Sequence, residues 1–77
     1  MSSAITVAKR HGFYPYTHDG SRYYMSSYSE IIIPYGSKWA YWRRESDNEE
    51  GRKPDALCPT LTDAVMYARE YEEAESL

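Results

Sequence analysis

The sequence has little of the chemistry that staples or anchors a small protein. Its single cysteine, Cys58, cannot form a disulfide within the chain, and with two histidines it falls short of the usual four-ligand zinc sets. It has no run of about 18 apolar residues, and the N-terminal stretch MSSAITVAKR lacks the apolar core of a signal peptide. We therefore expect a soluble, cytoplasmic protein that holds no metal or cofactor and does not enter a membrane.

Catalytic motifs are also missing. The four glycines are scattered as turn formers and make no phosphate-binding loop. His11 and His18 flank an aromatic segment without a catalytic spacing. Cys58 precedes a predicted helix whose dipole would lower the thiol pKa, but a small buried side chain is the commoner role for a cysteine. We expect no enzymatic activity.

The size of the chain predicts one small domain, residues 1–77. At 77 residues and 9.0 kDa, such a domain buries only about 60% of its unfolded surface, so packing or self-association has to supply its stability. Aromatic residues make up 16% of the chain, and nine of them are tyrosines against a single phenylalanine. Tyrosine is typical of interfaces, because it combines an apolar body with a polar rim.

Charge is distributed unevenly along the chain. Residues 1–44 carry six Lys or Arg and two acids, whereas residues 45–77 carry three Lys or Arg and ten acids. The net charge of −3 conceals this asymmetry. It indicates an electrostatic surface rather than any particular fold.

Three strands are predicted in the first part of the chain. Alternating β-branched residues predict a strand over 4–9, which continues as an edge through 13–16 past a bulge at Gly12. An Asp-Gly hairpin turn leads to a second strand over 22–33. A Pro-Tyr-Gly-Ser turn then leads to a third strand over 38–44.

The second part of the chain predicts a polar loop over 46–59 and a helix over 60–75. Thr60 is suited to cap the helix at Asp63. The helix carries an apolar stripe at helical spacing that consists of Leu61, Ala64, Val65, Ala68 and Tyr71. That stripe is expected to pack on the sheet.

The predicted fold class is α+β, with a three-stranded antiparallel β-sheet (meander) over residues 4–45 and one C-terminal α-helix packed on one face (βββα). One helix covers only one face of a sheet. In the third strand, Trp39 and Trp42 point to opposite faces of the sheet, and we call the side chains on each face the Trp39 row and the Trp42 row. The uncovered face would expose tyrosines together with one of these two rows, and alternation leaves open which. An exposed aromatic patch of this kind is typical of a contact surface.

These features predict a small non-catalytic protein-binding module that acts by occupying a partner's surface. Aromatic side chains would anchor the partner, and neighbouring arginines or the acidic loop would select it. The candidate binding residues are Tyr28, Trp39, Tyr41, Trp42, Arg43, Arg44, Glu49 and Glu50.

Two other functions stay open. Basic residues among tyrosines and tryptophans are suited to single-stranded nucleic acid, although an isoelectric point near 5.3 opposes phosphate binding. The bare sheet face or the edge strand at 13–16 could instead pair with a second copy in a homodimer. Within the protein-binding function itself, the acidic stretch 45–50 could occupy a basic groove on another protein.

In size, composition and architecture the chain resembles accessory proteins of bacteriophages and mobile elements, including inhibitors of host defence such as anti-CRISPR proteins. The resemblance covers no motif and assigns no residue a role. It implies an inhibitor of host machinery that acts in the cytoplasm of the host cell.

Overall fold

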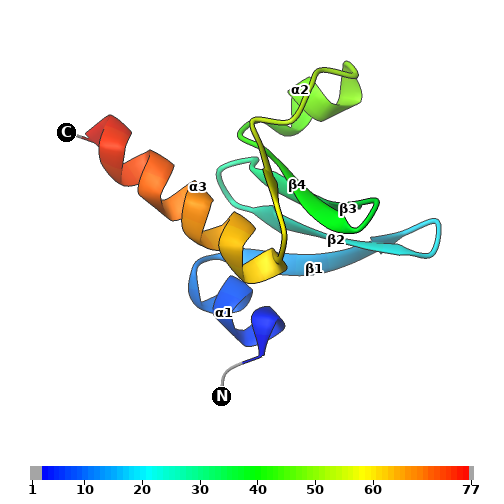
Figure 1. The fold of residues 1–77 in the computed structure, drawn as a ribbon, viewed down its shortest axis with the longest axis horizontal. Helices are drawn as coiled ribbons and strands as arrows, with labels where there is room; N and C mark the ends of the chain where they lie inside the picture. Colours follow the sequence, from blue (N-terminus) through cyan, green and yellow to red (C-terminus); the bar gives the residue numbers. More distant parts are fainter. Residues whose placement is uncertain (1–2, 77) are drawn as a thin grey trace.

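The computed structural model describes residues 3–76 and places side chains for residues 3–70. Three helices and five strands are described within these bounds (Figure 1). In chain order the elements are α1 (Ala4–Arg10), β1 (Phe13–His18), β2 (Ser21–Ser26), β3 (Ile31–Tyr35), β4 (Lys38–Trp42), α2 (Glu45–Glu49), β5 (Ala56–Cys58) and α3 (Leu61–Ser76).

The strands form one antiparallel meander in which each strand pairs with the next along the chain, so β1 and β5 lie at the edges. α1 and α3 contact each other on one face of this sheet (Figure 1). The α+β class and the antiparallel meander are confirmed. The predicted numbers of strands and helices are wrong, because the described residues form five strands rather than three and three helices rather than one.

The N-terminal segment forms α1, so the strand predicted over 4–9 is wrong. Ser3 caps the helix, since its Oγ accepts a hydrogen bond from the Thr6 N–H at 3.2 Å. The side of the helix that packs into the core consists of Ala4, Ile5 and Ala8. Burial of this side outweighs the weak preference of β-branched residues for strands, which is well under about 1 kcal/mol per residue.

Gly12 follows α1 and leads into the edge strand. Its φ of +86° is the left-handed conformation that commonly ends a helix, so it is not the predicted bulge. β1 is an edge strand as predicted, and there the missing N–H of Pro15 disrupts the ladder least. The Asp-Gly hairpin turn is also confirmed, with φ of 50° at Asp19 and 79° at Gly20, as a type I′ turn requires.

The second predicted strand, over 22–33, is in fact two strands. Between β2 and β3 the chain turns back, with Ser29 at a φ of 65°. The Ser26 Oγ accepts hydrogen bonds from the backbone N–H groups of Tyr28 and Glu30. Such local side-chain bonds compete with the strand ladder and end β2.

β4 confirms the third predicted strand apart from the last two residues of 38–44. The turn before it is shorter than predicted. Pro34 and Tyr35 still belong to β3, opposite Trp39 and Lys38, so only the two residues between the strands make the turn.

The polar loop predicted over 46–59 contains α2 and β5. Acidic residues lie in the first turn of α2, where they interact favourably with the positive end of the helix. β5 pairs with β4. Asp55, just before β5, makes two hydrogen bonds of 2.8 Å to this part of the chain: its N–H donates to Tyr41 O, and its Oδ2 accepts from the Arg43 N–H. Both elements depend on contacts with β4 that no local pattern reveals.

α3 confirms the helix predicted over 60–75. The Asp63 N–H donates to Thr60 Oγ1 at 3.1 Å, as the capping pattern predicts. The buried stripe consists of Leu61, Ala64, Val65 and Ala68, while the Tyr71 side chain lies outside the described residues. None of the helices within residues 3–76 is long and apolar enough to cross a membrane.

Two apolar clusters lie on opposite faces of the sheet. The larger cluster fills the space between the sheet and the helices α1 and α3. The smaller cluster, on the other face, is built around Ile31, Ala40 and Trp42. Trp39 packs against the larger cluster, so the Trp39 row faces the helices and the Trp42 row faces away from them.

Candidate binding surface

The sheet face turned away from α1 and α3 carries side chains from all five strands. Paired residues in antiparallel strands project to the same side, so the register defines this set. We call it the open face, and it comprises Tyr14, Tyr16 and His18 of β1, Ser21, Tyr23 and Met25 of β2, Ile31, Ile33 and Tyr35 of β3, Lys38, Ala40 and Trp42 of β4, and Leu57 of β5.

Large apolar side chains are exposed on the open face. Tyr14, Tyr16, Tyr35 and Leu57 are 52, 50, 53 and 49% exposed. Tyr16 also stacks on Tyr23 of the neighbouring strand, with ring centroids 5.8 Å apart. Exposed apolar side chains that gather on one face mark a contact surface, whereas single scattered ones need no explanation.

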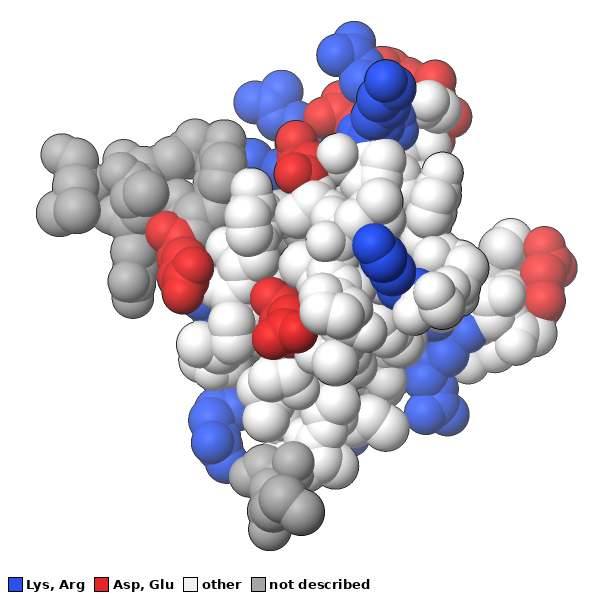
Figure 2. Space-filling model, viewed as in Figure 1, with Lys and Arg blue, Asp and Glu red and all other residues white. Residues whose placement is uncertain are grey.

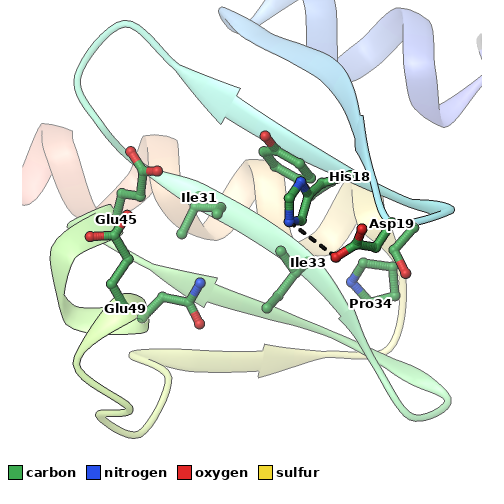
Figure 3. Close-up of a pocket in the computed structure, with 10 residues that line it drawn as sticks. His18, Asp19, Ile31, Ile33, Pro34, Glu45 and Glu49 are labelled. Atoms are coloured by element: carbon green, nitrogen blue, oxygen red, sulfur yellow. Dashed lines mark ion pairs between the residues drawn. The ribbon is translucent and has the colours of Figure 1, made fainter.

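The open face is hollowed into a groove of about 600 Å³ between the β1–β2 hairpin and α2. The groove is lined by His18, Asp19, Ser21, Tyr23, Ile31, Ile33, Pro34, Glu45, Asn48 and Glu49. Figure 3 shows Ile31 and Ile33 of β3 between the acidic side chains of α2 on one side and the hairpin turn on the other. The groove therefore has an apolar floor with polar walls.

The walls of the groove are acidic. Glu45 and Glu49 of α2 face the groove on one side and Asp19 on the other (Figure 3). His18 Nε2 lies 3.2 Å from Asp19 Oδ2. Among the described residues, no Lys or Arg lines the groove. A positive group is therefore favoured there and a phosphate is disfavoured.

The α2 wall is held in place by backbone contacts. The Glu45 N–H donates to Ser29 O at 2.8 Å, and the Arg52 N–H donates to Asp47 O at 3.0 Å. Trp42 Nε1 donates to Arg52 O at 2.9 Å, which ties this segment to the smaller apolar cluster. The acidic wall is thus built onto the sheet rather than carried by a free loop.

Four of the eight predicted binding residues lie close together beside the β2–β3 turn, next to the groove. Tyr28, 69% exposed, lines two small hollows of about 460 and 230 Å³. Arg44 lines both of them, Glu49 lines the larger, and Arg43 lines the smaller. These four residues therefore lie side by side on the surface, and their role in binding stays a prediction.

The other predicted residues lie elsewhere. Tyr41 and Trp42 are only 1 and 3% exposed, so neither is available as a surface anchor. Trp39 is partly buried on the helix-covered face. Glu50 Oε2 lies 2.9 Å from Arg52 Nε, and Glu50 does not line the groove.

The sequence predicts exposed tyrosines on the uncovered face, but its candidates, Tyr28 and Tyr41, leave out Tyr14, Tyr16 and Tyr35. Tyr14 and Tyr16 alternate with the more buried Phe13 and Pro15 along β1, whereas Tyr35 follows an exposed Pro34 at the end of β3. This period-two alternation is present in the sequence. For β1 it follows from the predicted edge strand, whereas the position of Tyr35 depends on the true end of β3, which the sequence assigns to a turn.

A buried polar network lies on the helix-covered side. The Glu30 carboxylate accepts hydrogen bonds from Ser26 Oγ at 2.9 Å, Tyr41 Oη at 2.7 Å and Arg69 Nη2 at 2.9 Å. The Arg69 guanidinium also lies 5.0 Å from the centroid of the Phe13 ring. Burial, followed by the bond to Glu30, raises the pKa of the Tyr41 hydroxyl far above its usual range.

Cys58 is a small side chain of the larger apolar cluster. Burial, followed by the negative charge of Asp63, raises the pKa of its thiol above the usual value. The start of α3 therefore does not activate this cysteine. A protonated thiol is a poor nucleophile, so the geometry favours a packing role.

The basic residues are dispersed over the structure. Lys38 is the one Lys or Arg of the open face, while Lys9 and Arg10 lie in α1 and Arg22 alternates to the other face of β2. Figure 2 shows Lys and Arg side chains in several separate places on the face viewed, with Asp and Glu side chains between them. A single basic track of the kind that follows a nucleic-acid backbone is not formed by these residues.

Comparison with protein-family models, with curated proteins and with solved structures finds no match. The function of this chain is therefore inferred from its own residues and their arrangement.

Proposed function

We propose that this chain is a small non-catalytic protein-binding module that occupies a partner's surface with its open face. One observation carries the proposal. Tyr14, Tyr16, Tyr35 and Leu57, each about half exposed, gather on the sheet face that α1 and α3 leave uncovered. A partner that covers this face would bury the apolar area that folding leaves in water.

Tyrosine on a sheet is well suited to this task. Its ring offers a large contact area with few rotatable bonds, and its hydroxyl can form a hydrogen bond at the rim. The Tyr16–Tyr23 stack holds one of these rings in place before any partner arrives. Less conformational freedom is then lost on binding, which strengthens the complex.

Binding of single-stranded nucleic acid has less support. Stacking on the open-face tyrosines is chemically feasible, but Asp19, Glu45 and Glu49 line the groove in the same face. Lys38 alone would have to offset their repulsion of phosphates. A protein partner fits this mixture of aromatic and acidic groups better.

The proposal includes an inhibitory role in the cytoplasm of a host cell, as the resemblance to accessory proteins of bacteriophages and mobile elements implies. Small size and tyrosine-rich composition are its support. An inhibitor of this size would act by masking a surface that its target needs.

Capture from a lysate of the native host, with and without nuclease, tests the proposal. The tagged wild type is compared with a Tyr16→Thr/Tyr35→Thr variant, because threonine keeps the strand preference and removes the rings. Met66→Ala, at an exposed position of α3, is the matched control. We expect a stoichiometric protein partner that survives nuclease, binds the control normally and binds the double variant about tenfold more weakly or worse.

Other outcomes would reject specific parts of the proposal. Equal capture by the double variant would place the interface away from the open face. Captured material that disappears with nuclease would favour the nucleic-acid alternative. Recovery of the chain itself as the sole partner would make it a self-associating module.

A further inference from the structure

We infer that the groove of the open face binds a basic segment of the partner, a stretch of chain with Lys or Arg residues around one apolar side chain. This inference rests on the proposed function, and it names the kind of chemistry that the face selects.

The floor of the groove suits one or two apolar side chains. Ile31 belongs to the smaller apolar cluster and Ile33 packs against it, so both continue a core into the groove. A volume of about 600 Å³ lies within the range of clefts that enclose small ligands. An apolar side chain seated on Ile33 would be removed from water on that side.

The walls of the groove specify the charge of the occupant. Asp19 and the pair Glu45 and Glu49 approach the floor from opposite sides (Figure 3). A seated apolar side chain would therefore have carboxylates on both flanks. Lys or Arg residues next to it in sequence would meet those carboxylates, and acidic neighbours would be repelled.

On the α2 side of the groove the carboxylates of Glu45 and Glu49 are not paired with Arg52, while on the other side Asp19 Oδ2 lies 3.2 Å from His18 Nε2. That arginine lies 2.9 Å from Glu50 and 3.7 Å from Asp47, the α2-segment acids that do not line the groove. Glu45 and Glu49 are the members of the segment that do line it. Trp42 of β4 donates to Arg52 O, and the Arg52 N–H donates to Asp47 O, so the backbone of α2 that carries these two carboxylates is tied to the sheet.

Selection from a displayed library of random 12-residue peptides tests the inference, because it presumes no sequence. Peptides enriched on the wild type are then titrated by fluorescence anisotropy at low and high salt. The groove variants are Glu45→Gln/Glu49→Gln and Ile33→Thr. The matched control is Asp63→Asn/Glu70→Gln, which removes two exposed acids from α3.

We expect the enriched peptides to carry an excess of Lys and Arg around a large apolar residue. Their affinity should fall about fivefold to twentyfold in Glu45→Gln/Glu49→Gln and be nearly unchanged in the α3 control. Ile33→Thr should weaken them by about tenfold. Raised salt should weaken binding to the wild type more than to the groove charge variant.

Four outcomes would overturn the inference. In the first, the enriched peptides show no excess of Lys and Arg and yet lose their affinity in Tyr16→Thr/Tyr35→Thr. That result would reject the basic segment but leave the proposed function standing. Basic peptides that bind the groove variants as tightly as the wild type would place the site elsewhere. If no group of related peptides is enriched, a linear segment is excluded as the occupant. If sedimentation shows a dimer whose interface covers the groove, the occupant is a second copy of the chain.

Discussion

Glu30 is the residue at which the described interactions converge most densely. Its buried carboxylate accepts hydrogen bonds from Ser26 at the end of β2, Tyr41 of β4 and Arg69 of α3. A buried charge is tolerated when it is paired and its remaining oxygens accept hydrogen bonds. Glu30 therefore links the β2–β3 turn, the sheet and the long helix, and it fixes the turn that carries Tyr28.

Removal of this carboxylate should destabilise the fold strongly. Glu30→Ala is expected to lower the free energy of unfolding by about 3–5 kcal/mol, because it removes the buried carboxylate to which Arg69, Tyr41 and Ser26 donate. Glu30→Gln, which keeps an oxygen acceptor, should lose less. Glu70→Ala, at an exposed position of α3, should change stability by less than about 0.5 kcal/mol. Urea unfolding followed by tryptophan fluorescence measures all three, and equal midpoints would contradict the role of the network.

Tyr41 should make stability depend on alkaline pH. Its pKa is raised in the folded state, so its contribution is fully present below the unfolded-state value of 10.0 and is lost as the pH rises above it. At full effect the loss is about 1.4 kcal/mol per pH unit. Tyr41→Phe should lower stability at pH 7 and flatten this dependence between about pH 10 and 11, as measured by urea midpoints. A slope in Tyr41→Phe as steep as in the wild type would contradict the burial of this hydroxyl as its cause.

Elements with short, local signals are predictable from this sequence. The alternation of β4, the Asp19-Gly20 turn and the Thr60 cap each depend on a few neighbouring residues, and the structure contains all three. α1, α2 and β5 depend on partners distant in sequence. Burial against α3 makes a helix of a β-branched segment, and pairing with β4 makes a strand of Ala56–Cys58.

The cap of α3 offers a test at the scale of an element. Thr60→Ala removes the hydroxyl that accepts the Asp63 N–H and should lower the free energy of unfolding by about 1 kcal/mol. Thr62→Ala, two residues further into the same helix, should be neutral or slightly stabilising, because alanine has the higher helix propensity. Thermal unfolding of both variants by circular dichroism makes the comparison. A loss at Thr62 equal to that at Thr60 would argue against the cap.

At the scale of the whole molecule, α1 and α3 cover one face of the sheet, and on the other face aromatic side chains lie exposed beside α2 and a small buried cluster. That a bare aromatic face exists is predictable, because one predicted helix covers only one side. Its members are not predictable: Trp42 is buried beneath the α2 segment, and Tyr14, Tyr16 and Tyr35 replace it on the surface. The acidic groove escapes prediction because its wall, α2, lies in a segment with no periodic pattern.

Loss of binding through the open face should not be a consequence of unfolding. Tyr16→Thr/Tyr35→Thr removes half-exposed rings and the Tyr16–Tyr23 stack, so it should lower the free energy of unfolding by only about 1–2 kcal/mol. Urea unfolding and a far-ultraviolet circular dichroism spectrum check this. A loss above about 4 kcal/mol would mean that the rings serve the fold rather than a partner.

Photo-crosslinking in cells of the native host tests the central claim most directly. A benzophenone side chain replaces either Tyr16, on the open face, or Met66, on the exposed side of α3. We expect a discrete crosslinked product with a second protein from position 16 and little or none from position 66. A product of equal yield from position 66, or one from that position alone, would contradict the assignment of the open face as the binding surface.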